Sequence, residues 1–293
     1  MQQHALIQLI ENIAQNDGDY STPIPALMVY RRSTASEPIP CIYGLGLGIT
    51  LQGRKRVTLG NEVFDYGHEQ SMVTSIDLPV ASYVTQATVH EPYLGMRLEL
   101  DARVIAQMAA EMDFLTPLKA SAVRALSVVS MDQGLLDALA RLVHLFDEPH
   151  LIPLLAPLIE QEIVVRLLNG EHGPTLRHLV TVGAPSQQIA KVIAWLKLHF
   201  TTDIAIDDLA AKAYMSPSTF RQHFRAITGI SPLQYVKQLR LQDARQLMLN
   251  DDVDASSAAI RVGYESASQF SREYTRLFGE PPLRDIKRVR ESS

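Results

Sequence analysis

Two stretches near the C-terminal end carry side chains that could bond DNA, at the same spacing in both. Residues 216–232 and 266–282 repeat one pattern at an offset of 50 residues. Arginine can pair with guanine O6 and N7, and glutamine with adenine N6 and N7, in the major groove. The candidate DNA contacts are Ser218, Arg221, Gln222 and Arg225 in the first stretch and Ser268, Gln269, Ser271, Arg272 and Arg276 in the second.

Each stretch predicts a short helix that would hold these side chains on one face. Each begins at a capping serine, Ser216 or Ser266, and ends at a glycine, Gly229 or Gly279. The opposite face is an apolar stripe, formed by Phe220, Phe224 and Ile227 in one copy and by Phe270, Tyr274 and Phe278 in the other. A shorter helix precedes each copy at an offset of 49, so the second turn is one residue longer. The chain therefore predicts two helix-turn-helix motifs, at about 207–229 and 256–279.

A longer helix is predicted between the two motifs. Ser231 and Pro232 cap it, and it runs to about Asn250. At 1.5 Å per residue this helix is a rod of roughly 27 Å. Such a rod would hold the two reading helices near one duplex turn apart, about 34 Å.

Any single motif of this kind could also be an ordinary helical hairpin. Two copies with matched polar faces argue for DNA reading instead. For Arg225 and Arg276 taken individually, a solvated helix face is as good an interpretation as a phosphate contact.

The length and composition of the chain limit the number of domains, the kind of partner and the cellular compartment that we expect. A chain of 293 residues is long enough for two domains. Residues 186–293 hold 15 Lys and Arg against 12 Asp and Glu, while residues 1–185 hold 12 against 20, so only the C-terminal part suits a polyanion. One cysteine excludes an intrachain disulfide and fits a reducing compartment. No secretory signal and no membrane-spanning apolar run is evident, so we expect a cytoplasmic protein without membrane contact.

The N-terminal part predicts a different architecture. Short segments rich in β-branched and aromatic residues, with a hairpin signal at Gly60 and Asn61, indicate a small antiparallel barrel, cupin-like, over about 20–100. After Asp101 the strands are expected to stop, and helical patterns follow at about 101–113, 132–147 and 155–169. The last two could pack on the barrel or on a second copy of the protein.

The segment 169–186, rich in glycine and proline, predicts the boundary between two domains. We expect an N-terminal effector-binding and dimerisation domain over 1–180, with helices over about 101–170, and a DNA-binding domain over 186–293. The fold class is α+β with two domains, the second all-helical. The apolar stripes of 186–293 predict a part that folds alone.

These ordered features resemble AraC-type transcriptional regulators. The resemblance covers roughly 187–288 and rests on Leu209-Ala210, Met215-Ser216-Pro217-Ser218, Phe220, Phe224, Thr228-Gly229, Ser231-Pro232, Tyr235, Leu239-Arg240, Ala244, Gly263-Tyr264, Ser266, Phe270-Ser271-Arg272, Phe278-Gly279 and Pro281-Pro282. The N-terminal half is similar to the sensor of one AraC subgroup at 52–57, 73–79 and 92–98. Glycine is usual in the family where Tyr214 stands, and Ile-Ala where Ala258-Ala259 stands.

The resemblance implies roles for the candidate residues. It places Ser218, Arg221, Gln222, Ser268 and Arg272 at base-reading positions. Arg225, Gln269 and Arg276 would contact phosphates or flank the site. It also implies a small-molecule effector of unknown identity, a homodimer, and promoter activation through contact with RNA polymerase.

Other chemistry finds little support in the sequence. His68-Glu69 and His90-Glu91 offer metal-ligand types, but no His-x-His with a following Glu occurs, so we expect neither a metal nor a catalytic site. No other cofactor is implied. Cys41 could sense an electrophile if Arg31 or Arg32 stabilised its thiolate, although a buried small hydrophobe is the better interpretation.

Gly44, Gly46 and Gly48 alternate along one expected strand. They would leave one face of the sheet bare, for a close-packed helix or for a guest. We expect an apolar or weakly polar effector there, beside Cys41. The sequence thus predicts a sequence-specific transcriptional regulator, with two alternatives: a metal-dependent cupin-type enzyme carrying a DNA-binding tail, and an effector-independent dimeric regulator.

Overall fold

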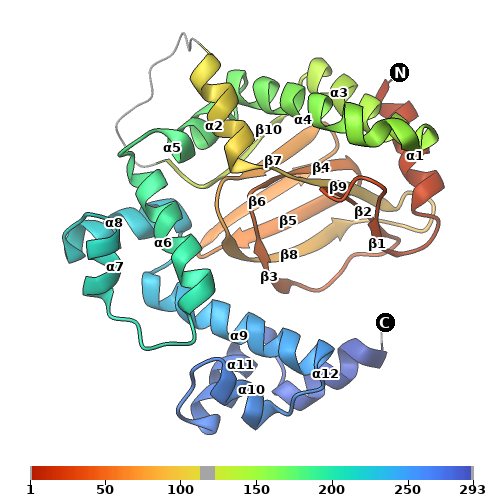
Figure 1. Cartoon of the computed structure of the whole chain (residues 1–293). Coiled ribbons are helices and arrows are strands. Elements are labelled where there is room, and N and C mark those ends of the chain that lie inside the picture. The colour runs from red at the N-terminus through yellow and green to blue at the C-terminus, as the bar shows by residue number, and fades with distance from the viewer. Residues whose placement is uncertain (1, 113–122, 292–293) are drawn as a thin grey trace.

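A computed structural model describes residues 2–112 and 123–291 of the chain (Figure 1). All the described strands lie in the N-terminal part, together with several helices. The described C-terminal part contains helices only, which confirms the α+β class. The strands are β1 (Gly18–Ser21), β2 (Leu27–Arg32), β3 (Ile39–Tyr43), β4 (Gly46–Gln52), β5 (Arg54–Leu59), β6 (Glu62–Gly67), β7 (Gln70–Thr74), β8 (Leu78–Gln86), β9 (Tyr93–Glu99) and β10 (Leu126–Ser130). The N-terminal helices are α1 (Gln2–Ile13), α2 (Ala102–Glu111), α3 (Gln133–His144), α4 (Ile152–Asn169) and α5 (Gly173–Val180). The C-terminal helices are α6 (Pro185–His199), α7 (Ile206–Lys212), α8 (Pro217–Thr228), α9 (Pro232–Asn250), α10 (Ala255–Arg261), α11 (Ala267–Phe278) and α12 (Pro282–Glu291).

Two antiparallel sheets form the N-terminal barrel. The larger sheet has the order β1-β2-β9-β4-β7-β10, and the smaller has the order β3-β8-β5-β6. Side chains alternate between the two faces of each strand. On β4, Leu47 and Ile49 face the covering helices, while Gly46 and Gly48 face the interior between the sheets.

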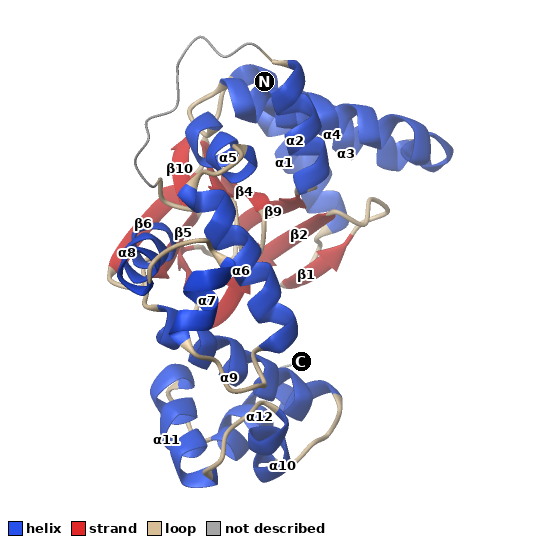
Figure 2. Cartoon of the chain, turned by 60° about the vertical axis from the view of Figure 1, so that its left-hand side comes forward, coloured by secondary structure: helices blue, strands red, loops and turns tan. Residues whose placement is uncertain are grey.

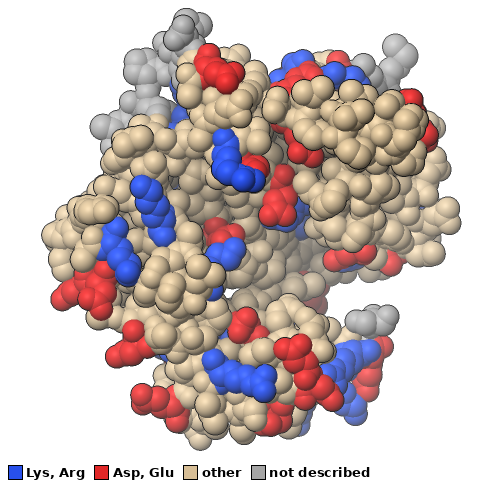
Figure 3. Space-filling view, viewed as in Figure 1, with Lys and Arg blue, Asp and Glu red and all other residues tan. Residues whose placement is uncertain are grey.

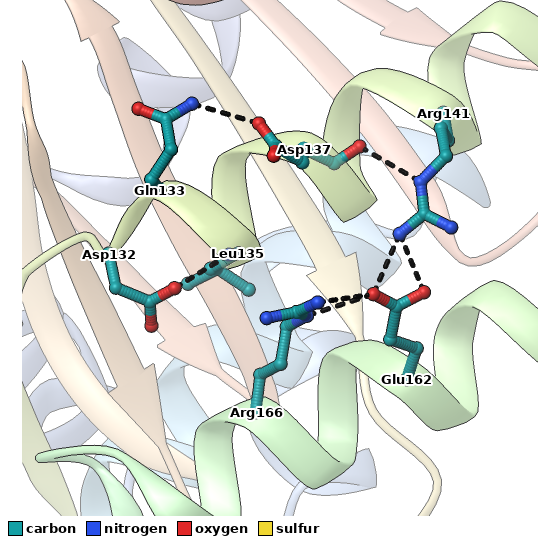
Figure 4. A network of polar contacts seen from close by, with 7 residues as sticks. All are labelled: Asp132, Gln133, Leu135, Asp137, Arg141, Glu162 and Arg166. Carbon is teal, nitrogen blue, oxygen red and sulfur yellow. Dashed lines mark hydrogen bonds and ion pairs between the residues drawn. The ribbon is translucent and has the colours of Figure 1, made fainter.

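Helices α1 to α5 cover the outer face of the larger sheet (Figure 2). Helices α3 and α4 are joined by Glu162, which accepts hydrogen bonds from Arg141 and Arg166 at 2.6 to 2.9 Å (Figure 4). These two arginines lower the pKa of Glu162, because both favour its ionised form. The predicted helices are confirmed, although residue 113, the expected end of α2, lies outside the described residues. The apolar stripe of α4 is buried only in part, because Leu155 and Leu158 at its start are exposed.

Three expectations about the N-terminal part are wrong. The strands do not stop after Asp101, because β10 adds an edge to the larger sheet beside β7. The apolar run at 42–51 is two strands, β3 and β4, in different sheets. Gly44 lies between these strands and therefore does not continue the alternation of Gly46 and Gly48.

The segment 169–186, where we expected the boundary between two domains, packs against the barrel. It contains α5, whose Leu176 lies in the core beneath the larger sheet. His172 next to it is buried between two hydroxyls, with Ser71 Oγ at 2.9 Å from Nε2 and Ser127 Oγ at 2.7 Å from Nδ1. The glycine and proline content of segment 169–186 indicated turns. The two ring nitrogens of His172 and the side chain of Leu176 nevertheless fix this segment to the barrel.

The first helix-turn-helix motif shares a hydrophobic core with the barrel. One cluster of buried side chains contains Val57, Leu59, Leu78 and Val80 from the smaller sheet together with Phe220, Phe224, Ile227 and Tyr235 from α8 and α9. The expectation that the apolar stripes of 186–293 are self-contained is therefore wrong for the first motif. Its stripe also packs against strands that lie more than 130 residues earlier, a contact that helical periodicity cannot reveal.

The second helix-turn-helix motif has a core of its own. It contains Phe270 and Tyr274 of α11 with residues of α9, α10 and α12. Asp285 is fully buried there, where it accepts hydrogen bonds from Arg245 (2.7 and 2.9 Å) and from the Tyr274 hydroxyl (2.7 Å). Ala258 and Ala259, which stand where the family usually has Ile-Ala, are both buried in this core.

Candidate nucleic-acid interface and ligand cavity

The two helices that carry the candidate DNA contacts, α8 and α11, begin and end as their sequences predict. Ser216 accepts a hydrogen bond from the Thr219 N–H, and Ser266 from the Gln269 N–H, each at 3.3 Å. Gly229 and Gly279 end α8 and α11 in the left-handed conformation, with φ of 77° and 80°. Both helices are therefore fixed at each end, independently of any DNA.

The apolar stripe of each reading helix is turned inward. Phe220, Phe224 and Phe270 are at most 1% exposed, and Tyr274 is 0% exposed. Phe278 is only partly buried, although its ring packs on Tyr274 with centroids 4.4 Å apart. A helix fixed along one stripe presents the opposite stripe to solvent in a defined orientation.

The candidate DNA contacts occupy that opposite stripe. All nine are exposed except Ser271, which is half-buried. Gln269 donates a 3.1 Å hydrogen bond to Glu273, which also binds Lys237, so its amide is partly engaged within the protein. The face in Figure 3 shows acidic and basic side chains interspersed over the C-terminal helices.

The arginines of the reading helices differ from most others in the chain. Arg221, Arg225, Arg272 and Arg276 form no ion pair within the part of the chain that the structure describes. Several other exposed arginines pair with acids, as Arg290 does with Asp252 at 2.7 Å, whereas Arg54, Arg261 and Arg284 form no ion pair among the described residues either. Unpaired guanidinium groups on a rigid helix face are suited to bidentate contacts with guanine or phosphate.

One residue that pattern reasoning did not single out ties the two motifs together. The guanidinium of Arg240, on α9, donates to the backbone oxygens of Phe200 (2.7 Å), Thr202 (2.7 Å) and Gly263 (3.0 Å). Phe200 and Thr202 precede the first motif, and Gly263 lies in the turn of the second. The Leu239-Arg240 pair was part of the resemblance, but its role depends on tertiary contacts.

A cavity of about 290 Å³ lies inside the barrel. Gly46, Gly48 and Cys41 line it as expected, whereas Gly44 does not. The lining is more polar than we expected, because it includes Lys55 and Arg97 together with several tyrosines. A Cβ on Gly48 would lie 3.6 Å from the Tyr66 hydroxyl and 3.7 Å from the Met72 methyl group, which is ordinary van der Waals contact, so a small side chain would fit at this position without a clash.

Cys41 is a weakly acidic thiol in this cavity. Burial raises its pKa to about 11, although Lys55 and Arg97 lower it in part. The expected neighbours Arg31 and Arg32 serve other groups: Arg31 donates to the Ala14 oxygen and Arg32 pairs with Asp19. The thiol therefore stays protonated at neutral pH and behaves as a buried small side chain.

The metal-ligand candidates lie apart on exposed turns, His68-Glu69 after β6 and His90-Glu91 between β8 and β9. Within the described ranges, no three His, Cys, Asp or Glu side chains gather as a metal site would require. No described helix is both long enough and apolar enough to cross a membrane.

Comparison with known proteins places these features in a family. The barrel and its helices, residues 23–175, match the model of the AraC-type transcriptional regulator N-terminus, and residues 209–288 match a helix-turn-helix domain. The first match alone covers more than half of the chain, so this protein belongs to the AraC-type transcriptional regulators.

Individual relatives support the family over part of the chain. The regulator ExsA of Pseudomonas aeruginosa is 27% identical over 132 residues, which are 45% of this chain and 47% of ExsA. The transcriptional activator RhaS of Klebsiella pneumoniae is 30% identical over 105 residues, 36% of this chain and 37% of RhaS. The chain thus spans less than half the length of these curated relatives.

The fold of this chain is similar to that of a solved structure over most of its length. The structure of ToxT from Vibrio cholerae superposes with a TM-score of 0.57 over 89% of this chain and 96% of ToxT. The two sequences are 12% identical, so this similarity concerns the fold alone.

Proposed function

We propose that this protein is a sequence-specific DNA-binding transcriptional regulator that reads two successive major grooves of double-stranded DNA. The observation that carries the proposal is the pair of rigid helices α8 and α11, each with exposed, unpaired arginines. Arg221, Gln222 and Arg272 would read base edges, with Ser218 and Ser268 beside them. Arg225, Gln269, Ser271 and Arg276 would contact phosphates or flank the bases.

Helix α9 sets the separation of the two reading helices. Its 19 residues span roughly 28 Å at 1.5 Å per residue. Arg240 and the two cores fix the motifs at either end of it. The separation suits two grooves about one turn, or roughly 34 Å, apart on one face of the duplex.

The test is selection of binding sites by the full-length protein from random-sequence DNA, followed by footprinting on the selected site. We expect two protected patches roughly 10 base pairs apart on one face. A single patch, or retention of all sequences equally, would refute the two-groove reading.

The barrel would act as the sensor of a small molecule. Tyr66 and Met72 line the cavity and also belong to the core shared with α8 and α9. A guest in the cavity would therefore touch side chains that hold the first motif. It would alter how firmly the barrel restrains that motif, and hence DNA affinity, because its affinity for the two arrangements would differ.

Dimerisation would occur through α3 and α4. Leu154 and Leu158 at the start of α4 are 67% and 59% exposed, and Leu155 is 37% exposed. A row of exposed leucines on one helix is typical of a surface that a second copy covers. Sedimentation of the full chain tests this, and a monomer at tens of micromolar would refute it.

The protein would activate a nearby promoter by contact with RNA polymerase rather than repress it, and the similarity to RhaS, whose name is that of an activator, supports activation. The protein would act in the cytoplasm, on chromosomal DNA, and would perform no catalysis of its own. A regulator whose barrel only dimerises would show no ligand-dependent thermal shift. By contrast, a cupin-type enzyme would need a metal that purified protein carries in stoichiometric amount.

A further inference from the structure

We propose that the barrel cavity binds a small organic carboxylate with an apolar body, whose carboxylate pairs with Lys55. The proposal rests on the sensor role of the barrel and adds the chemical class of the effector. It follows from the charges, the aromatic groups and the size of the cavity.

The charged groups in the cavity do not balance. Asp19 and Arg32 form an ion pair with each other. Lys55 and Arg97 also line the cavity, and neither has an acidic partner among residues 2–112 and 123–291. Two cations therefore face a partly open cavity in which the described residues supply no matching anion. Unpaired charge in such a place is costly, and an anionic guest would offset that cost.

Lys55 is placed by aromatic rings, not by acids. Its Nζ lies 5.5 Å from the Tyr43 ring centroid, 5.8 Å from that of Tyr30 and 5.9 Å from that of Tyr93. The ring faces attract the ammonium but supply no formal negative charge, so a carboxylate can still pair with it. A carboxylate would thus complete the coordination of a group that is already oriented.

The tyrosine rings around Lys55 favour its ammonium form. Burial opposes the charge on Lys55, and the ring faces of Tyr43, Tyr30 and Tyr93 counteract that effect. Burial also raises the pKa of Tyr30 and Tyr43, so their hydroxyls stay neutral. The cavity therefore offers cations and hydroxyl groups to its guest, and no competing anion apart from the paired Asp19.

The remaining lining describes the body of the guest. Ile39, Met72, Val84 and Met96 provide apolar surface. The volume of about 290 Å³ is roughly twice that of a cavity that holds benzene, about 150 Å³. The described lining comes from strands and from Ser36, with no helix N-terminus pointing inward, which favours a carboxylate over a phosphate group.

A bound carboxylate could affect, through Arg97, an ion pair that connects the barrel to the DNA-binding part of the chain. A Cβ on Gly44 would lie 3.3 Å from Arg97 Nη2 and 2.9 Å from Asp77 Oδ1, so these two side chains flank the same backbone position. Asp77 in turn forms an ion pair with Lys197 of α6 at 2.7 Å. An anion that draws Arg97 into the cavity would change the electrostatic environment of the Asp77–Lys197 pair.

The experiment compares acids with their uncharged amides on the full-length protein. Benzoate, 3-phenylpropanoate and hexanoate, each at up to 10 mM, are titrated by thermal shift and calorimetry beside benzamide, 3-phenylpropanamide and hexanamide. Inorganic phosphate is a further arm. We expect at least one acid to bind saturably at least 10-fold more tightly than its amide and than phosphate.

Two variants locate the site, and a third controls for charge. Lys55→Met should weaken the acid at least 10-fold, and Gly48→Leu, which fills the cavity, should abolish binding. Lys191→Met removes an exposed lysine of α6 and should change nothing. Should Lys55→Met unfold, Arg97→Gln supplies the same readout with a smaller change in the cavity.

The proposal is overturned if no acid binds by 10 mM, if acids and amides bind alike, if phosphate binds as tightly as the acids, or if the folded cavity variants retain the acid. In parallel, we would measure how tightly the wild-type protein and each variant bind the DNA selected above. If the acids show no selectivity while DNA binding is intact, only the proposed carboxylate site is refuted. If the protein does not bind DNA sequence-specifically, the proposed function is refuted instead.

Discussion

The hydroxyl of Tyr235, on the long helix α9, donates a 2.9 Å hydrogen bond to the backbone oxygen of Asp77 in the barrel. Tyr235 is 0% exposed, and its ring packs edge-on against Phe224 of the reading helix α8, with centroids 5.5 Å apart. One side chain therefore links the barrel to the helix that we propose reads DNA. Arg124 adds a second link, donating to the backbone oxygen of Ala226 at 2.7 Å while it pairs with Glu62.

Tyr235→Phe should loosen this link without creating a cavity. The buried hydrogen bond is lost, so we expect the free energy of unfolding to fall by about 1 kcal/mol. Lys197→Met removes the neighbouring ion pair with Asp77, whose lysine is 51% exposed, and should cost less than about 1 kcal/mol. Urea unfolding measures both variants, and an equal or reversed order would contradict the importance of the Tyr235 hydrogen bond.

Arg272→Ala and Gln222→Ala should relax base preference at separate half-sites. Each removes one major-groove contact and leaves the core unchanged, so each should cost about 1 to 3 kcal/mol of discrimination at its own position. Binding to a panel of single-base operator variants measures the effect. Arg103→Ala, an exposed change on α2, is the control. If both variants bind every operator as the wild type does, the assignment of reading helices is wrong.

Asp285→Ala should unfold the second motif selectively. It leaves Arg245 buried without its carboxylate, so we expect a loss of about 3 to 5 kcal/mol. Burial raises the pKa of Asp285, but Arg245 and Tyr274 lower it more, and the net pKa lies below its ordinary value. This contribution is therefore present above the ordinary pKa of 3.8 and lost as the pH falls through the lowered value.

Hydrogen exchange would locate the damage from Asp285→Ala. Amides of α10 to α12 should lose protection while those of the barrel keep theirs, because the second motif has its own core. Uniform loss over the whole chain would show instead that both motifs and the barrel unfold as one unit.

How far sequence reasoning reached depends on the range of the contacts. The caps at Ser216 and Ser266 and the glycines that end α8 and α11 are local features, and the structure confirms them. Tyr235 and Arg240 belonged to recognised motifs, yet their partners lie far away in the sequence. No local pattern indicates that the stripe of α8 also packs on a sheet. The lack of an acidic partner for Lys55 among the described residues likewise becomes visible only once the strands that line the cavity are assembled around it.

His172 should make the protein sensitive to acid. Burial lowers its pKa to about 4 from the ordinary 6.5, because removal from water disfavours the charged imidazolium. A lowered pKa gives stability that is fully present above pH 6.5 and lost as the pH falls through about 4. The slope within this window is at most about 1.4 kcal/mol per pH unit.

Urea unfolding of His172→Gln at several pH values tests this prediction. The glutamine can bond one hydroxyl but cannot titrate, so the slope between pH 6.5 and 4 should decrease while some stability is lost at pH 7. His178 has a pKa lowered by burial and by Arg177, so a smaller slope should remain. An unchanged slope would mean that His172 does not titrate in this range.

Tyr214→Gly should stabilise the first motif. Tyr214 lies in the turn between α7 and α8 with φ of 53°, a left-handed conformation that costs a residue with a Cβ about 1 to 2 kcal/mol. Its counterpart Gly263 adopts φ of 86° in the second turn, where glycine has no such cost. The ring of Tyr214 is 86% exposed, so its removal sacrifices little packing. The greater entropy of unfolded glycine, roughly 0.5 to 1 kcal/mol, offsets part of the gain. We expect a net increase of about 0.5 to 1 kcal/mol in the free energy of unfolding.

Tyr214→Ala, which removes the ring but keeps the Cβ, is the matched control. If Tyr214→Gly is no more stable than Tyr214→Ala, the turn at this position is not strained.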